Sequence, residues 1–372
     1  MKKVYLDNTS TTAMLPEVRD AMLPYLGEYF GNPSCIHEWG DAPREALDIA
    51  REQVARLIGG LPEEIIFTAS GTEANNFAVK GLAMANQKKG KHIVVSAIEH
   101  FSVLNSCKTL EKIGFTFTTV PVDKNGLVNP EDVRKAIKPE TILVSIMHAN
   151  NEVGTIQPLQ EISKITRERG VVLHTDAVAT AGTIPVDVKD LGVDALSLAG
   201  NMFYGPKGVG ALWVKKGVRI LPLLDGGVQE GGRRAGTENV AGIVGLGKAA
   251  EIALSQIPAR ITRVTALRDR LLKGLSEKVS HVIITGDTVK RLPGHASFCV
   301  EFIEGESMLM MLNSRGVAVT SGSACTSKAL QASHVLLAMG LPHEIARSSL
   351  LFGLSIHNTK EDVDYVLEVM SP

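Results

Sequence analysis

The chain has 372 residues, of which 44% are hydrophobic and 21% are charged. This composition is that of a folded globular protein and excludes a largely disordered chain. Lys and Arg number 39 and Asp and Glu number 40, and this net charge of -1 gives no broad electrostatic surface for nucleic acid or an anionic membrane. The polar start, MKKVYLDNTSTT, is unlike a signal peptide, and no apolar run approaches the roughly 20 residues of a membrane helix. Four cysteines are too few for a disulfide scaffold, so we expect a soluble protein of a reducing, cytoplasmic compartment.

Short apolar runs alternate with longer amphipathic segments over most of the chain. The apolar runs predict buried strands, and the amphipathic segments predict helices. The predicted strands are residues 64–69, 92–97, 141–147, 171–175 and 208–214, and the predicted helices are residues 73–85, 102–113, 130–137 and 159–169. Such alternation predicts an α/β fold with a largely parallel sheet and helices on both of its faces.

A glycine-rich loop at residues 226–236 breaks this alternation. A long helical stretch follows from Thr237 to about Val279, with one predicted interruption at Pro258. The remainder is a shorter α+β mixture, with predicted strands at 281–285, 295–301 and 318–320 and helices that begin at Glu306 and Lys360. We therefore expect a large α/β domain over residues 15–260 and a smaller α+β domain made of residues 1–14 and 261–372.

The segment from Ala69 to Glu73 follows a predicted strand and opens a predicted helix. Small residues there leave backbone N–H groups free at a helix N-terminus, which favours a bound phosphate near Gly71 and Thr72. The alternative is a plain strand–helix turn in which Thr72 is the N-cap. No glycine-rich dinucleotide or P-loop fingerprint decides between the two.

Three polar residues follow predicted strands, where open α/β sheets bind ligands. Asp176 could pair with a protonated ring nitrogen, or it could cap the next helix. His100 could stack on a flat ligand or move a proton, although a lone histidine is more often structural. Asn151 could hold a phenolic oxygen, or it could belong to a turn.

Cys325 differs in its setting from the other three cysteines, because it lies in the small, polar segment TSGSACTS. An exposed loop of this kind could carry a thiolate to and from a site, although surface loops also contain cysteines without a function. Cys299 lies in a predicted strand and Cys107 on a predicted helix, so both are expected in the core. Cys35 lies in a predicted turn and suggests no role.

These segments together resemble the cysteine desulfurases of the iron–sulphur assembly type, which are class V aminotransferases. The resemblance rests on YLDNTSTT, GNPSCIH, FTASGTEANN, EH at residues 99–100, MHANNEVGTIQP, HTDAV, FYGPKGVGALWV, RRAGTEN and SGSACTS, in order along nearly the whole chain. It implies the fold type I architecture of pyridoxal-phosphate enzymes, a homodimer, L-cysteine as substrate, and transfer of a persulfide to an iron–sulphur scaffold protein.

The resemblance also implies a role for each matching residue. Gly71 and Thr72 would hold the cofactor phosphate, and Thr237 would reach the phosphate in the neighbouring subunit. His100 would stack on the pyridine ring, Asn151 would contact the ring oxygen, and Asp176 would pair with the ring nitrogen. Cys325 would be the nucleophile that accepts sulphur, and as a soft thiolate it could also ligate the metal of an iron–sulphur cluster shared with a partner.

Five positions depart from the family pattern. The family has Ser-x-His-Lys before its FYGPKG-like run, whereas this chain has Ala199, Gly200, Asn201 and Met202. Met202 replaces the lysine that forms the Schiff base, Ala179 replaces a glutamine, and Leu351 replaces the arginine that clamps the substrate carboxylate. Lys207 belongs to the FYGPKG-like run itself, where the family also has a lysine, so it is a poor substitute.

Three functions fit this pattern. The first is a sulphur-transfer or cluster-assembly protein that keeps the fold and Cys325 while its cofactor chemistry is weakened or lost. The second is a working cysteine desulfurase that binds pyridoxal phosphate noncovalently. The third is a non-catalytic interaction subunit in which Cys325 has no role. In each case we expect Gly71, His100, Asp176 and Met202 to line one crevice.

Overall fold

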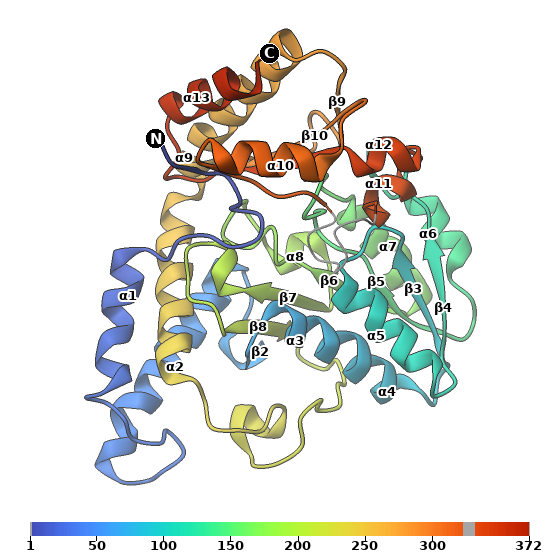
Figure 1. The fold of residues 1–372 in the computed structure, drawn as a ribbon. Helices are drawn as coiled ribbons and strands as arrows, with labels where there is room; N and C mark the ends of the chain where they lie inside the picture. Colours follow the sequence, from blue (N-terminus) through green and yellow to red (C-terminus); the bar gives the residue numbers. More distant parts are fainter. Residues whose placement is uncertain (1, 323–331, 372) are drawn as a thin grey trace.

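The fold is that of a computed structural model in which residues 2–322 and 332–371 are described (Figure 1). Within these residues, seven strands form a mixed sheet in the order β2-β8-β7-β6-β5-β3-β4. The strands are β2 (Ile65–Thr68), β3 (His92–Ser96), β4 (Thr116–Val120), β5 (Thr141–Ser145), β6 (Val172–Asp176), β7 (Ala195–Ala199) and β8 (Gly210–Val214). Strands β3 to β7 pair in parallel, whereas β8 is antiparallel to both β2 and β7. The predicted α/β fold with a mostly parallel sheet is confirmed.

Five of these strands coincide with predicted ones, but β4 and β7 were not predicted. β4 has the sequence TFTTV and is partly exposed along most of its length, so it lacks the continuous apolar run of a buried strand. β7 has the sequence ALSLA and is fully buried, but its alanines and leucines favour a helix as much as a strand. Pairing with neighbouring strands, rather than local propensity, makes both segments extended.

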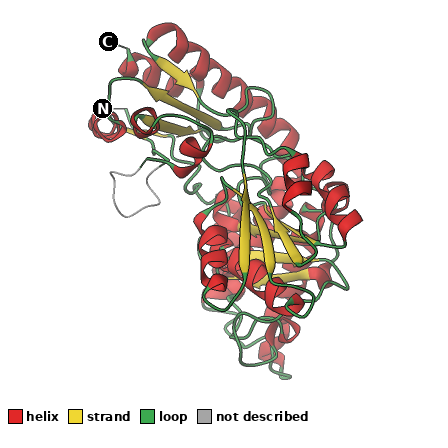
Figure 2. Cartoon of the chain, turned by 90° about the vertical axis from the view of Figure 1, so that its right-hand side faces the viewer, coloured by secondary structure: helices red, strands yellow, loops and turns green. Residues whose placement is uncertain are grey.

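Helices enclose the large sheet, as Figure 2 shows. They are α1 (Pro16–Met22), α2 (Glu38–Leu57), α3 (Gly71–Asn76), α4 (Leu82–Asn86), α5 (Phe101–Glu111), α6 (Pro130–Ala136), α7 (Leu159–Arg169) and α8 (Val188–Leu191), with a π-helical turn (Phe77–Gly81) joining α3 to α4. Successive strand residues point to opposite faces, so Ile93 and Val95 of β3 lie in one core cluster and Val94 in another. The predicted helices at 73–85, 102–113, 130–137 and 159–169 are confirmed.

The longest helix, α9 (Val240–Lys278), runs beside α1 and α2 and continues to α13 (Lys360–Met370) (Figure 1). The predicted interruption at Pro258 is wrong, because α9 passes through Pro258 without a break. Pro258 lies on the exposed face, where water can bond the carbonyl that the proline leaves without a donor. By length and composition alone α9 could cross a membrane, but 56% of its most apolar window is buried inside the fold.

The last third of the chain forms a second sheet with the order β12-β10-β9. Its elements are β9 (Val282–Ile284), β10 (His295–Val300), α10 (Gly305–Ser314), β11 (Val317–Ala318), α11 (His334–Ala338), α12 (His343–Arg347), β12 (Ser349–Gly353) and α13, and β11 pairs in parallel with β1 (Val4–Tyr5). Most of these elements share a hydrophobic core with Val4, Leu6 and the end of α9, whereas α11 and α12 pack in a separate cluster with Met147 and Cys299. The boundary near residue 260 stays a prediction.

Candidate functional site

A cavity of about 290 Å³ opens at the carboxyl ends of the parallel strands, and we call it the main cavity. Five predicted ligand-binding residues line it: Gly71, Thr72, His100, Asn151 and Asp176. The five positions that the sequence analysis predicts to depart from the family pattern line it too: Ala179, Ala199, Asn201, Met202 and Leu351. The predicted crevice therefore exists, and it brings together the matching and the departing positions.

Two of the predicted residues are not part of this lining. Thr237 lies exposed just before α9, and it does not line the main cavity within this chain. Cys325 lies outside the described residues. Among the other cysteines, Cys107 on α5 and Cys299 on β10 are buried, as predicted. The described residues contain no cluster of three or more His, Cys, Asp or Glu side chains that could hold a metal ion.

Asp176 ends β6 and is held by two hydrogen bonds. The Asn75 side-chain amide donates to Asp176 Oδ2 over 2.6 Å, and the backbone N–H of Val178 donates to Oδ1 over 2.9 Å. Burial raises the pKa of Asp176, and the nearby His100 opposes that rise. Residues 178–183 form turns rather than a helix, so Asp176 is no helix cap. Its buried carboxyl group suits a positively charged partner in the cavity.

A chain of hydrogen bonds links Asp176 to His100 through two residues that the sequence analysis missed. Asn75 Nδ2, which bonds Asp176, also donates to Ser102 Oγ over 2.9 Å, and Ser102 Oγ lies 2.7 Å from His100 Nδ1. The backbone N–H of Ser102 donates to the same Nδ1, so His100 caps α5. Asn75 and Ser102 could have been found as polar residues on the buried faces of their helices.

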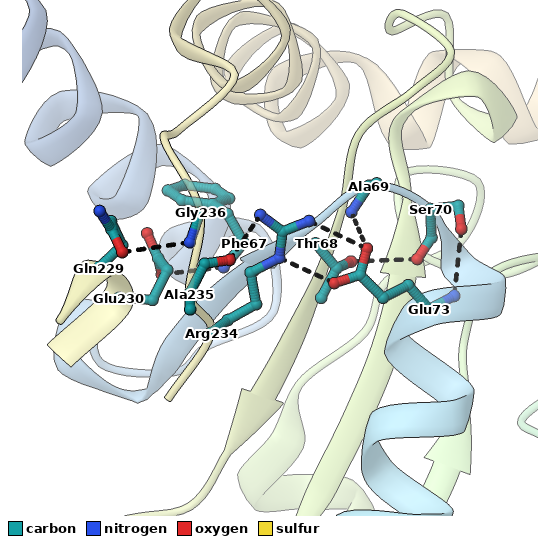
Figure 3. Close-up of polar contacts among 10 residues, drawn as sticks. All are labelled: Phe67, Thr68, Ala69, Ser70, Glu73, Gln229, Glu230, Arg234, Ala235 and Gly236. Atoms are coloured by element: carbon teal, nitrogen blue, oxygen red, sulfur yellow. Dashed lines mark hydrogen bonds and ion pairs between the residues drawn. The ribbon is translucent and has the colours of Figure 1, made fainter. Parts of the chain in front are cut away.

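The start of α3 is fixed by a capping network (Figure 3). Ser70 Oγ accepts from the backbone N–H of Glu73, and Glu73 Oε2 accepts from the backbone N–H of Ala69 over 2.7 Å. Ser70 is thus the N-cap, and the alternative that placed Thr72 there is wrong. A Cβ at Gly71 would lie 2.6 Å from Val178 Cγ2, so only glycine lets the helix start approach this closely.

The glycine-rich loop at 226–236 contacts this capping network. Arg234 Nε donates to Glu73 Oε1 over 2.9 Å, and the two side chains are only 20% and 15% exposed (Figure 3). Glu230 accepts from the backbone N–H of Phe67 on β2 and forms a bidentate ion pair with Arg51. The loop therefore holds the strand–helix turn that borders the main cavity.

Two buried glutamates lie at or next to the main cavity. Glu152 lines it and accepts from Ser333 Oγ over 2.5 Å, and burial raises the pKa of Glu152 to about 7. Glu99 accepts from Ser96 Oγ and the backbone N–H of Met147, and burial raises its pKa to about 8. Both groups bind protons near neutral pH, so this region can hold or release protons.

The five positions that the sequence analysis predicts to depart from the family pattern supply no amine to the described lining of the main cavity. Ala179, Ala199, Met202 and Leu351 are apolar, and Asn201 donates only to Thr11 Oγ1 and to the Met202 sulphur. Lys207 is exposed and does not line the cavity. Among the described lining residues there is no lysine or arginine, so no side chain there can form a Schiff base.

Comparisons with known proteins agree with this architecture. The sequence profile of the family described as Aminotransferase class-V matches residues 4–366. The chain is 51% identical to "Cysteine desulfurase IscS" of Dictyoglomus turgidum, over 99% of this chain and 94% of that one. It is 52% identical to "Cysteine desulfurase IscS" of Methanosarcina thermophila, over 99% and 91% of the two chains.

A solved structure of a "NIFS-like protein" superimposes with a TM-score of 0.94 at 37% identity, covering 99% of this chain and 98% of the other. At this identity and coverage, the likeness extends over both parts of the fold and over the strands that border the main cavity. The chain belongs to the class V aminotransferase family, and within this family it is similar to the IscS-type cysteine desulfurases.

Proposed function

We propose that this chain is a sulphur-transfer protein of iron–sulphur cluster assembly, with pyridoxal-phosphate-dependent desulfuration weakened or lost. One observation carries the proposal: Asp176 keeps its buried hydrogen-bond network, while the described lining of the same cavity has no amine. Cofactor binding and cofactor chemistry are therefore separated in this chain. The relatives named cysteine desulfurase IscS support the role in cluster assembly.

The main cavity fits pyridoxal phosphate held without a covalent bond. Asp176 is a buried carboxyl group with no lysine or arginine beside it in the described lining, and the buried Asn75 Oδ1 has no hydrogen-bond partner. Asp176 would pair with the ring nitrogen, His100 would cover the ring, and Gly71 and Thr72 would bind the phosphate. When bound, pyridoxal phosphate supplies an electron sink for chemistry at the α-carbon of an amino acid.

This chain's own residues supply only part of what such chemistry needs. His100 and the buried Glu152 can hold or move a proton, and Asp176 holds a positive ring nitrogen in place. The described lining offers no arginine for a substrate carboxylate and no lysine as a positioned base. General acid–base assistance contributes about 10²–10⁴ in rate, so its loss alone leaves desulfuration slow.

Cys325 is the proposed carrier of sulphur. Its thiolate would attack the outer sulphur of a donor persulfide, which leaves the donor as a thiolate and Cys325 as the persulfide. The persulfide would then pass to the thiolate of a scaffold protein in the same way. The support is its place in SGSACTS, the segment that matches the family's sulphur-accepting loop. Ligation of a shared iron–sulphur cluster by Cys325 belongs to the same proposal.

The proposed assembly is a homodimer, in which Thr237 would reach the cofactor phosphate of the partner subunit. It is supported by large apolar side chains exposed between α1 and the start of α2: Leu26 is 68% exposed, Phe30 72%, Ile36 99% and Trp39 58%. Exposed apolar surface of this kind marks association sites. Sedimentation of the purified protein would measure the mass, and a monomer at micromolar concentration would contradict a dimer.

The first experiment tests cofactor and chemistry separately. Purified protein is titrated with pyridoxal phosphate, treated with borohydride, and analysed for a covalent adduct and for alanine formed from L-cysteine. We expect saturable binding that gel filtration reverses, no adduct at Met202, and alanine near background. Rapid alanine formation would support a second candidate, a working desulfurase with noncovalent cofactor, which the intact Asp176 network favours.

The second experiment tests Cys325. A small persulfide donor loads the protein, and sulphur transfer to a scaffold protein is measured by mass spectrometry. Cys325→Ser should abolish loading and transfer, whereas the matched Cys35→Ser, at the one described cysteine that is not buried, should retain both. Transfer that survives Cys325→Ser would reduce the chain to a platform for its partner.

A further inference from the structure

A second cavity of about 60 Å³ adjoins the main cavity, and we call it the arginine cavity. Both cavities are lined by Thr9, Ala179 and Met202. The lining of the second one also includes Arg260 from α9, His295 from the start of β10, and the polar residues Asn8, Thr12, Thr183 and Tyr204. Nothing in the proposed function uses this space, and the inference drawn from it is independent of that function.

Three side chains that line the arginine cavity each carry a buried polar atom without a partner. The described residues contain six buried side-chain nitrogen or oxygen atoms that lack a hydrogen-bond partner. Three of them, Thr9 Oγ1, Arg260 Nη1 and His295 Nδ1, belong to side chains that line this one small cavity. Arg260 and His295 are each only 7% exposed, so bulk water does not serve them. Buried polar groups are normally paired, and their convergence indicates a ligand that the cavity is shaped to hold.

The buried positive charge of Arg260 indicates that this ligand is an anion. Its Nε and Nη2 both donate to Gln256 Oε1, over 3.2 and 3.0 Å, and its guanidinium lies 4.8 Å from the centre of the Tyr204 ring. Burial lowers the pKa of Arg260, and the one opposing group is the Tyr204 phenol rather than a carboxylate. Water could bond Nη1 but would leave a buried charge without a counter-charge. Arg260 is the sole lysine or arginine in the described lining of either cavity.

His295 favours a ligand that also carries a hydrogen-bond donor. Burial, together with the positive charges of Arg291 and Arg268, lowers the pKa of His295 to about 3, so the ring is neutral. Its other nitrogen donates to the backbone of Asn151, which leaves Nδ1 as an acceptor. The cavity therefore presents a cation, an acceptor and the Thr9 hydroxyl, which can act as donor or acceptor.

We propose that the arginine cavity binds a small monoanion that carries one hydrogen, with its negative atom at Arg260 and its hydrogen toward His295. Hydrosulfide and bicarbonate share this chemistry. A volume of about 60 Å³ holds only a few heavy atoms, which excludes nucleotides and phosphorylated cofactors. Chloride and acetate carry the charge but lack the hydrogen, so they are the discriminating comparison.

The test is ligand-dependent stability of the full-length protein. Thermal unfolding is followed at about pH 8 and constant ionic strength, with about 10 mM sodium hydrosulfide, bicarbonate, chloride or acetate. A ligand that binds only the folded state raises the unfolding temperature, and we expect an increase of about 2 °C or more with hydrosulfide or bicarbonate and none with chloride or acetate. A response to only one of the first two identifies the source of the anion. An equal response to all four, or to none, overturns the proposal.

Variants connect the response to the cavity. Arg260→Gln should abolish it, whereas Arg263→Gln should retain it, because Arg263 is exposed on the same helix and donates to Asn358 O instead of lining the cavity. If Arg260→Gln does not fold, Arg260→Lys keeps the charge and moves it, and the response should fall. His295→Phe should remove the preference for hydrosulfide or bicarbonate over chloride. A full response in Arg260→Gln would place the anion elsewhere and end the proposal.

Discussion

The main cavity and the arginine cavity share Met202 but have opposite electrical character. The main cavity has Asp176 and Glu152 in its described lining and no lysine or arginine, and burial raises the pKa of both acids. The arginine cavity has Arg260 and His295 and no carboxyl group in its described lining, and burial lowers the pKa of both bases. Burial disfavours the charged form in each case.

This difference indicates that the ionisable groups in each cavity, and not the net charge of -1, determine which ligand the cavity suits. The described lining supplies no lysine or arginine beside Asp176 and no carboxyl group beside Arg260. The main cavity therefore suits a positive ring nitrogen, and the arginine cavity suits an anion. Met202 lines both and offers neither charge nor a strong hydrogen bond, so it separates two sites instead of joining them.

The largest expected effect comes from removing the charge of Asp176. Asp176→Asn keeps the size of the side chain but should weaken the binding of pyridoxal phosphate about 10–150-fold, because a charge-assisted hydrogen bond is worth about 1.5–3 kcal/mol. Fluorescence titration with the cofactor measures this change. The anion response of the arginine cavity should be unaffected. Unchanged cofactor affinity would show that the acidic character of the main cavity does not select its ligand.

A matched control keeps this measurement specific. Asp364 is a partly exposed aspartate that pairs with Arg270 far along the chain, and Asp364→Asn should leave cofactor affinity as it is. If both variants lose affinity equally, the effect comes from net charge or stability rather than from the site.

The second effect is a pH dependence that Glu152 gives to the main cavity. Burial raises its pKa to about 7 in the folded protein, from 4.5, so the folded state binds more protons than the unfolded state between these values. The contribution of Glu152 to stability is therefore present below about pH 4.5 and is lost as pH rises toward about 7. Glu152→Gln removes this loss, so the variant should gain up to about 3 kcal/mol relative to the parent by about pH 8.

Denaturant unfolding at several pH values checks this sign. The amide of the variant can still accept from Ser333, so packing is preserved while titration is removed. Glu344→Gln is the matched control, because Glu344 is exposed and should give parallel curves. A Glu152→Gln curve parallel to that of the parent protein would mean that Glu152 is ionised at neutral pH, and the main cavity would then be more strongly anionic than we infer.

Residues of the main cavity could be predicted from the sequence, whereas those of the arginine cavity could not. Residues of the main cavity follow strands with a clear apolar signal, so Asp176, His100 and Asn151 could be placed at one edge of a sheet. The arginine cavity could not be predicted, since Thr9, Arg260 and His295 come from three distant segments and no one motif joins them. Only the packing of the N-terminal segment, α9 and β10 brings them together.

The local hydrogen-bond networks could not be predicted from the sequence either. Ser70 rather than Thr72 caps α3 because Ser70 Oγ accepts from the backbone N–H of Glu73, and Asn75 reaches Asp176 only because α3 packs against β7 and β8 of the same sheet. The continuous α9 is another feature that the sequence pattern did not predict. A proline on an exposed helix face costs one hydrogen bond that water can replace, and sequence patterns do not report which face is exposed.

The third effect tests whether the two cavities are mechanically separate. Arg234→Met removes the ion pair to Glu73 and should lower the free energy of unfolding by about 1 kcal/mol, because the pair is partly buried and holds a helix cap. Cofactor affinity should fall a few-fold, since the start of α3 borders the main cavity. The anion response should persist. Lys248→Met, which breaks an exposed pair with Glu251, is the control and should change neither.

The smallest effect is expected from Met202→Lys, the substitution for which the family pattern suggests the largest effect. Met202→Lys introduces an amine at a position shared by both cavities, yet Ala179, Ala199, Asn201 and Leu351 remain. The new amine would lack its phosphate-side and carboxylate-side partners, so alanine formation from L-cysteine should rise by less than about tenfold, or about 1.4 kcal/mol in barrier. The matched comparison adds Ala179→Gln, Ala199→Ser, Asn201→His and Leu351→Arg to the same chain. A large gain that requires all five changes would show that catalysis was lost across the site as a unit, because residues that act together are not additive. Rapid turnover from Met202→Lys alone would instead show that one missing amine separates this chain from a complete enzyme, and the neutral boundary between the two cavities would then be its single defect.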